Sequence, residues 1–255
     1  MIAMAQLHEL LDYTHRLLEA ERFSDYCPNG LQVAGCAEVT QLVSGVTASL
    51  ALLEAAVDHG AQAVLVHHGY FWKGEDPCVT GMKRRRLHCL LTNDISLIAY
   101  HLPLDAHLVL GNNAQLAGRL GFTVQGRLGQ AGAMQIGMFG ELGQGVTGAE
   151  LGQHITQQLG RPPLHIPGRA QRIKRIGWCT GAAQGYIHEA IALGLDAYIS
   201  GEASEQTVHE ARESGLHYFG AGHHATERYG VHALGDHLAK QFDVSHRFID
   251  IDNPV

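Results

Sequence analysis

The chain has 255 residues, of which 45% are hydrophobic, and this suits one large or two small domains with a substantial buried core. Eighteen Lys and Arg against 25 Asp and Glu give a formal charge of -7, so no strong nucleic-acid binding by the whole surface is expected. No run is long enough to span a membrane and no signal-peptide pattern is present, which predicts a cytoplasmic protein without a membrane partner. Five cysteines without a Cys-x-x-Cys spacing indicate neither a disulfide framework nor a thiolate zinc site.

The first half of the chain predicts a β-α-β unit that follows an amphipathic helix. In chain order the expected elements are a helix over residues 5–20, a turn over 25–30, an extended segment over 31–33, a strand over 42–47, a helix over 52–57 and a strand over 63–66. Gly60 ends the second of these helices. The last strand leads directly to a pair of histidines.

The second half repeats this plan after a Gly- and Gln-rich stretch. The expected elements are an edge strand over 135–139, a helix from a capping box at Thr147 and Glu150 to about residue 159, a strand over 173–179, a helix over 187–191, a strand over 197–200, a helix over 231–238 and a strand over 247–251. Aligning Gly60 with Gly194 places Glu202 at the position of His68. We therefore expect an α/β fold of two related α/β halves with mixed sheets, residues 1–125 and 126–255, packed around a shared site.

Metal-ligand side chains follow the apolar runs in both halves. They are His67 and His68, then His101 with Asp105, and finally His223 with Glu227. Sites in open α/β sheets gather beyond the carboxyl ends of strands, so these distant segments can converge. Because imidazole and carboxylate together bind divalent transition metals, the pattern predicts a metal centre.

The alternative is chance, because 18 histidines in this length would produce about one His-His pair at random. The other histidines in helices or loops are expected to be solvated. These are His8, His15, His59, His88, His154, His188, His209, His232, His237 and His246. Position at strand ends, rather than the number of pairs, favours the metal site.

The spacing of the ligands favours two ions. Successive side chains of a strand point to opposite faces, so His67 and His68 bind one ion only if the strand ends and the backbone turns there. His223 and Glu227 are four residues apart at the start of a helix and share a face. Zinc, iron or manganese suits such ligands better than magnesium, and two ions activating a water predict metal-assisted hydrolysis.

Other residues near these ligands keep two interpretations each. His101 is an auxiliary ligand or catalytic group, or a core histidine bonded to the backbone. Glu202 and Glu205 are acid-base candidates or solvated loop carboxylates. Residues 83–86, Lys-Arg-Arg-Arg, bind phosphate or form a solvated helix face, and the aromatics over 70–72 stack on a base or pack a loop.

Seven strings of the sequence carry a family resemblance: DYCPNGLQV, GVTAS, LVHHGYFWKG, HLPLDAH, GNNAQLA, SGEASEQ and AGHHATERYG. Over nearly its whole length the chain resembles the NGG-interacting-factor-three-like family, also called the GTP cyclohydrolase I type 2 family, and most closely its short bacterial YbgI-type members. The resemblance implies two metal ions per subunit, held by His67, His68, Asp105, His223 and Glu227. It also implies a toroidal homohexamer whose metal sites face an internal cavity.

The function expected from these observations is a dinuclear metal-dependent hydrolase, GTP cyclohydrolase I type 2-like, that acts on C–N bonds of a nucleotide-like or cyclic amide small molecule. Two alternatives remain open at this point. One is a non-enzymatic metal-binding hexameric scaffold or regulatory protein, and the other is a di-iron redox enzyme. A fold and a metal site are shared by more proteins than any one substrate is, so the resemblance identifies the site better than the substrate.

Overall fold

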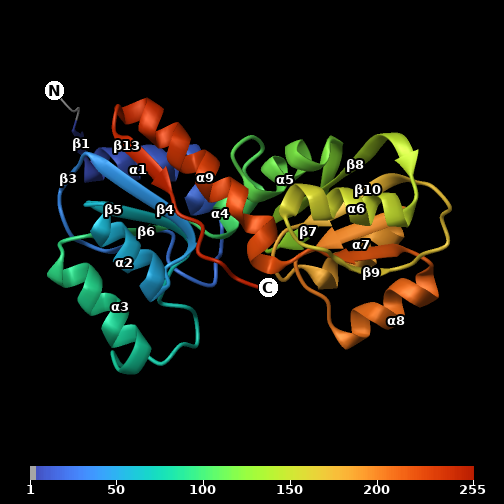
Figure 1. The fold of residues 1–255 in the computed structure, drawn as a ribbon, viewed down its shortest axis with the longest axis horizontal. Helices are drawn as coiled ribbons and strands as arrows, with labels where there is room; N and C mark the ends of the chain where they lie inside the picture. The colour runs from blue at the N-terminus through green and yellow to red at the C-terminus, as the bar shows by residue number, and fades with distance from the viewer. Residues whose placement is uncertain (1–3) are drawn as a thin grey trace. The chain divides into compact units, whose positions relative to one another are not determined.

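A computed structural model describes residues 4–255 of the chain, which form an α/β fold with two mixed sheets (Figure 1). The fold divides into two compact units. The first unit comprises residues 4–104 and Gly230–Asp252, and the second comprises Asp105–Tyr229 and Asn253–Val255. The division into related halves at residues 125 and 126 concerns internal repetition and stays a prediction. Within the described residues, no helix has the length and apolar character needed to cross a membrane.

The first unit contains a five-stranded sheet in the order β13-β4-β5-β6-β2. Its strands are β13 (Ser245–Phe248), β4 (Gln41–Thr47), β5 (Ala63–His68), β6 (Ser96–Ala99) and β2 (Gly30–Val33). All neighbours are parallel except β2, which runs antiparallel to β6. The carboxyl ends of β4, β5 and β6 therefore lie at one edge of the sheet.

Helices cover this sheet. They are α1 (Leu7–Leu17), α2 (Leu50–Asp58), α3 (Gly81–Thr92) and the C-terminal part of α9 (His223–Phe242), with the short η1 (Ala20–Arg22) after α1 and the small β1–β3 pair (Ala5–Gln6, Glu38–Val39) beside it. Leucines of α2 and α3 pack with valines of β4 and β5 in one buried cluster. On α1, Tyr13 bonds His237 of α9 at 2.8 Å. The buried leucines of α1 explain its amphipathic pattern.

The second unit contains a six-stranded sheet in the order β7-β8-β10-β11-β12-β9. Its strands are β7 (Phe122–Ala131), β8 (Met134–Val146), β10 (Ile173–Cys179), β11 (Ala197–Ser200), β12 (His217–Gly220) and β9 (Leu164–Ile166). The three central strands β10, β11 and β12 are parallel, and the other pairs are antiparallel. Here too the carboxyl ends of parallel neighbours meet at one edge.

The helices of the second unit are α5 (Asn112–Leu120), α6 (Gly148–Leu159), the short η2 (Gln184–Tyr186), α7 (Ile187–Ala192) and α8 (Glu205–Ser214). Leucines of α5 and α6 pack against Trp178 and the apolar side chains of β10 to β12. Figure 1 shows α5 and α6 on the opposite side of this sheet from α8. The capping box predicted at Thr147 and Glu150 is confirmed, since both of its hydrogen bonds are present. The boundary between the units falls within α4 (Leu102–Ala106) and within α9.

Three expectations about elements are wrong. The strand expected at a sheet edge is β8, which pairs on both sides because β7 and β10 flank it. The last strand is β13 at Ser245–Phe248 rather than 247–251, since its pairing with β4 begins opposite Gln41. His246, expected to be solvated, has a side chain only 3% exposed, because it lies in β13 and bonds Ser44 and Asp236.

Candidate metal centre

Three imidazoles lie together at the sheet edge of the first unit. His67 and His68 are the last residues of β5, and His101 follows β6. Ring centroids are 4.6 Å apart for His67 and His68, 5.1 Å for His67 and His101, and 5.7 Å for His68 and His101. One ligand nitrogen of each lies within 4.8 Å of the others. These three residues are called the imidazole cluster below.

Hydrogen bonds fix the rings of β5. The Nδ1 atom of His67 lies 3.0 Å from the carbonyl oxygen of Tyr100. A carbonyl only accepts, so Nδ1 carries the proton and Nε2 carries the lone pair that a metal requires. His68 Nδ1 lies 3.2 Å from Thr47 Oγ1. The sequence predicted a strand that ends at residue 66, before the histidine pair. In the structure β5 continues through His68, which pairs with Thr47 of β4.

A buried carboxylate holds His101. Its Nδ1 lies 2.7 Å from Oδ1 of Asp25, whose side chain is 3% exposed. Burial alone would raise the pKa of Asp25, but the hydrogen bond and charge of His101, with further bonds from Asn29 and Tyr26, lower it. The sequence allowed His101 to be a core histidine whose ring bonds the backbone. Its ring instead bonds the carboxylate of Asp25. Asp25 was not singled out by the sequence, in which it reads as a turn former.

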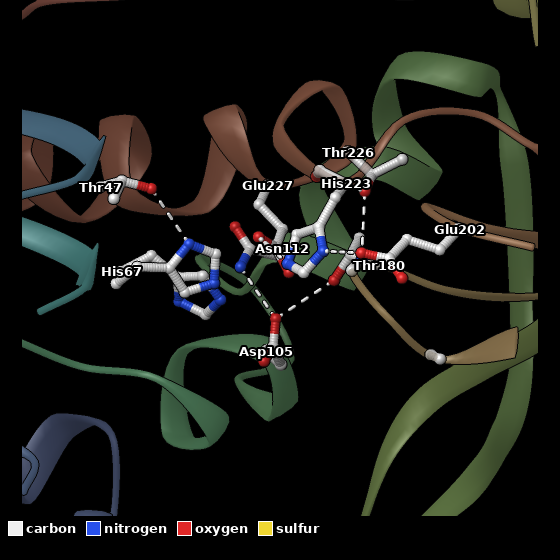
Figure 2. Close-up of polar contacts among 12 residues, drawn as sticks. Thr47, His67, Asp105, Asn112, Thr180, Glu202, His223, Thr226 and Glu227 are labelled. Carbon is white, nitrogen blue, oxygen red and sulfur yellow. Dashed lines mark hydrogen bonds and ion pairs between the residues drawn. The ribbon is translucent and has the colours of Figure 1, made fainter. Parts of the chain in front are cut away.

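Two buried carboxylates occupy the second unit. Asp105 is 5% and Glu227 2% exposed, and carboxylate oxygens of the two lie within 4.8 Å of each other. Asp105 Oδ1 accepts hydrogen bonds from Asn112 Nδ2 at 2.8 Å and Thr180 Oγ1 at 3.1 Å (Figure 2). Buried ionised carboxylates this close repel each other unless a proton or cation compensates them. This pair therefore fits a cation.

His223 lies between two carboxylates at the start of α9. Its Nε2 is 3.2 Å from Glu227 Oε2, and its Nδ1 is 2.7 Å from Glu202 Oε1 (Figure 2). Burial alone would lower the pKa of His223, but the hydrogen bonds and charges of Glu227 and Glu202 outweigh burial and raise it to about 9. The face shared by His223 and Glu227, expected from their spacing, is confirmed by this contact.

Glycine makes room for the Glu227 carboxylate. Gly181 follows β10 with a φ of +70°, and a Cβ there would lie 2.2 Å from Glu227 Oε1 and 3.3 Å from His223 Nε2. The Gly181 amide in turn donates to Thr226 Oγ1 at 3.2 Å. Only glycine satisfies both the left-handed backbone and the close approach. The sequence alone gave no reason to choose this glycine among 31.

The remaining predicted residues have simpler settings. Glu202 bonds His223, whereas Glu205 is exposed in the first turn of α8. Lys83 pairs with Glu75 and lies 5.1 Å from the Phe71 ring centroid, and its neighbours at 84 and 85 are exposed on α3. Trp72 lies edge-on to His101 with centroids 5.1 Å apart, so an aromatic does border the imidazole cluster.

The donor atoms of the two units are of the kind that transition metals bind. The first unit offers three imidazoles, of which His67 has its lone pair fixed on Nε2, and the second offers buried carboxylates beside an imidazole. Mixed nitrogen and oxygen donors suit zinc, iron or manganese. Each unit therefore carries residues that could bind metal.

Comparison with known proteins identifies the family of the chain. The family model described as Duf34/NIF3 (NGG1p interacting factor 3) matches residues 5–254. A Pseudomonas aeruginosa protein named GTP cyclohydrolase 1 type 2 homolog is 58% identical over 249 residues, covering 98% of both chains. The Escherichia coli K12 protein of the same name is 52% identical over 248 residues, which is 97% of this chain and 98% of that protein. The chain belongs to the Duf34/NIF3 family.

Solved structures share the fold. The protein ybgI, whose title gives its function as unknown, superposes with a TM-score of 0.95 at 51% identity, covering 98% of this chain and all of that one. The protein TTHA1606 from Thermus thermophilus gives a TM-score of 0.86 at 30% identity, with the same coverage. The α/β fold with mixed sheets and the resemblance seen in the sequence are both confirmed.

Proposed function

We propose that this protein is a dinuclear metal-dependent hydrolase. The proposed ligands of two divalent ions, zinc, iron or manganese, are His67, His68, Asp105, His223 and Glu227. The observation that carries the proposal is the buried pair of carboxylates, Asp105 and Glu227, since such a pair requires a compensating charge. Membership of a family with this ligand pattern supports the joint use of residues from both units.

Two bound ions lower the pKa of a water molecule and polarise a carbonyl or phosphoryl oxygen. The residues around them keep the ligands in place. Asn112 and Thr180 donate to Oδ1 of Asp105 and hold its carboxylate in place. Glu202 accepts from Nδ1 of His223, so Nε2 is the ring nitrogen that would lose its proton and bind an ion. Glu202 and His101 are the two candidates for acid-base catalysis. The Glu202 side chain is 37% exposed and that of His101 is 15% exposed, so Glu202 exchanges protons with solvent more readily and is the better candidate.

The proposed substrate is a nucleotide-like or cyclic amide small molecule with a hydrolysable C–N bond. Two features support this class. The relatives of 51% to 58% identity carry the name GTP cyclohydrolase 1 type 2 homolog, and Tyr26, 60% exposed, together with Trp72 flanks His101 at centroid distances of 6.4 and 5.1 Å. Exposed aromatic faces bind planar rings by stacking. We also propose a homohexameric assembly, which light scattering of the purified protein tests.

The experiment combines metal content with turnover. Protein purified without added metal is compared with a His68→Ala, Glu227→Ala double variant. The matched control is a His188→Ala, Glu210→Ala variant, which removes a partly exposed His–Glu pair of the second unit. We expect about two ions per chain in the wild type and the matched control, and loss of both ions and turnover of GTP or a cyclic amide panel in the double variant.

Three results would contradict the proposal. Turnover that survives in the metal-free double variant would remove the catalytic assignment. Protein that binds no zinc, iron or manganese even after reloading would favour the scaffold alternative. An oxygen-dependent reaction specific to the iron-loaded protein would replace hydrolysis with the di-iron alternative.

A further inference from the structure

The loop over residues 25–29 forms hydrogen bonds with both the backbone amide and the ring of His101. Asn29 Oδ1 accepts from the His101 amide at 2.8 Å, and Asp25 Oδ1 lies 2.7 Å from the ring Nδ1. Trp72 stands edge-on to the same ring at an interplanar angle of 86°. The amide of Lys73 donates to the carbonyl of Tyr26 at 2.7 Å and ties the loop to the segment that carries Trp72. The ring is therefore fixed on several sides.

The Asp25 carboxylate is saturated with donors. Oδ1 accepts from the amide of Tyr26 at 2.6 Å besides the His101 ring, and Oδ2 accepts from Asn29 Nδ2 and the amide of Leu102, both at 2.9 Å. Cys27 lies in the same group of possible ligands, but burial raises the pKa of its thiol to about 12, with a further contribution from Asp25. With both oxygens occupied by donors, the Asp25 carboxylate serves as a hydrogen-bonded support for His101.

We propose that Asp25 is a positioning residue that holds His101 in its Nδ1–H tautomer, so that Nε2 presents a lone pair to His67 and His68. An ionised carboxylate only accepts, which places the proton on Nδ1. One nitrogen of each of the three rings lies within 4.8 Å of the other two. Asp25 thereby adds a third imidazole acceptor to the cluster, for an ion or for a water bound to it. The consequence rests on the proposed metal centre, whereas the tautomer does not.

Substitution of Asp25 by asparagine has a defined effect on this arrangement. An asparagine has one acceptor oxygen and one donor amide in place of two acceptors. If its oxygen faced His101 and Tyr26, its amide would oppose two donors, Asn29 Nδ2 and the Leu102 amide. In the reverse orientation it opposes only the Tyr26 amide, because the His101 ring can change tautomer and accept. Asp25→Asn therefore favours the Nε2–H tautomer, the kind of error that the same exchange produces in a Ser-His-Asp triad.

The test is two-bond ¹H–¹⁵N NMR of metal-free protein labelled at histidine, with the His101 signals assigned by their loss in His101→Gln. Wild type should show protonated Nδ1 and unprotonated Nε2 for His101. Asp25→Asn should show the reverse. Asp236→Asn is the matched control, because Asp236 Oδ1 also lies 2.8 Å from a ring Nδ1, that of His246, and its loss should leave His101 unchanged.

Addition of Zn²⁺ provides a second readout that does not depend on turnover. In wild type the Nε2 resonance of His101 should shift, while in Asp25→Asn the shift should be lost or reduced several-fold. An Nε2–H tautomer in metal-free wild type, or no response of His101 to bound zinc, would overturn the proposal, and neither result requires that the variant fold. Absence of hydrolysis in all variants would instead count against the proposed function and leave the tautomer result standing.

Discussion

In the candidate metal centre, a carboxylate of the first unit orients His101 and a carboxylate of the second orients His223, but the two pairs differ in their surroundings. Asp25, 3% exposed, accepts four hydrogen bonds and holds His101 in the first unit. Glu202, 37% exposed, holds His223 in the second. A buried and saturated carboxylate fixes geometry at the cost of mobility, whereas a solvated one can rotate and exchange protons. The Asp25–His101 pair therefore keeps its ring in one orientation, whereas the Glu202–His223 pair stays accessible to solvent.

The close packing around Glu227 should give the largest effect. Gly181→Ala forces a Cβ against Glu227 Oε1 and imposes a left-handed backbone on alanine. We expect a loss of about 4 kcal/mol in the free energy of unfolding of the metal-free protein, and weaker metal binding. Urea unfolding and metal titration measure both. Gly118→Ala, in the open interior of α5, is the control and should be neutral or stabilising; equal losses in both would refute the steric argument.

Removal of the Asp25 carboxylate, which accepts four hydrogen bonds, should cause the second largest loss of stability. Asp25→Ala leaves two backbone amides, Asn29 and His101 without their acceptor, which should cost about 3 kcal/mol in the free energy of unfolding. Because the pKa of Asp25 is lowered in the folded protein, its stabilisation is present above the unfolded pKa of about 4 and is lost as pH falls below it. Urea unfolding from pH 7 to 3 measures both effects. A cost below that of Glu202→Ala would reverse the comparison drawn between the units.

The pH dependence of the second unit should have the opposite sign. The folded pKa of His223 is raised to about 9, so its stabilisation of the metal-free protein is complete below the unfolded pKa of about 6.5 and disappears as pH rises through 9. We expect a loss of about 3 kcal/mol in the free energy of unfolding over that range. Glu227→Gln should flatten the profile. A profile that is already flat in wild type would show that His223 is not charged near neutral pH.

The smallest effect should follow removal of the solvated carboxylate. Glu202→Ala should change the free energy of unfolding by less than about 1 kcal/mol, because an exposed pair is screened by water. Its metal affinity should nevertheless fall about tenfold or more, since His223 loses the acceptor that fixes its tautomer. Calorimetric titration with zinc, beside urea unfolding, separates the two quantities. Unchanged affinity would assign Glu202 to substrate chemistry alone.

Local patterns in the sequence were sufficient to predict most of the helices and strands. The capping box at Thr147, the strands over 173–179 and 197–200, and the i,i+4 pair of His223 and Glu227 depend on neighbours along the chain, so periodicity and spacing predict them. The position of β8 inside its sheet was missed, because strand order is set by long-range pairing that no local run encodes. His246 was assigned to solvent for the same reason.

By itself, the sequence determined the types of residue at the strand ends, the α/β class and the family, because these follow from composition, periodicity and motifs. Only the tertiary structure decided which of them interact. Asp25 reads as a turn former until the antiparallel pairing of β2 with β6 brings its loop to His101, and Gly181 is one glycine among many until β10 places it against Glu227. Contacts between residues distant in sequence depend on how the strands pair, and that pairing is a property of the whole packed sheet rather than of any segment.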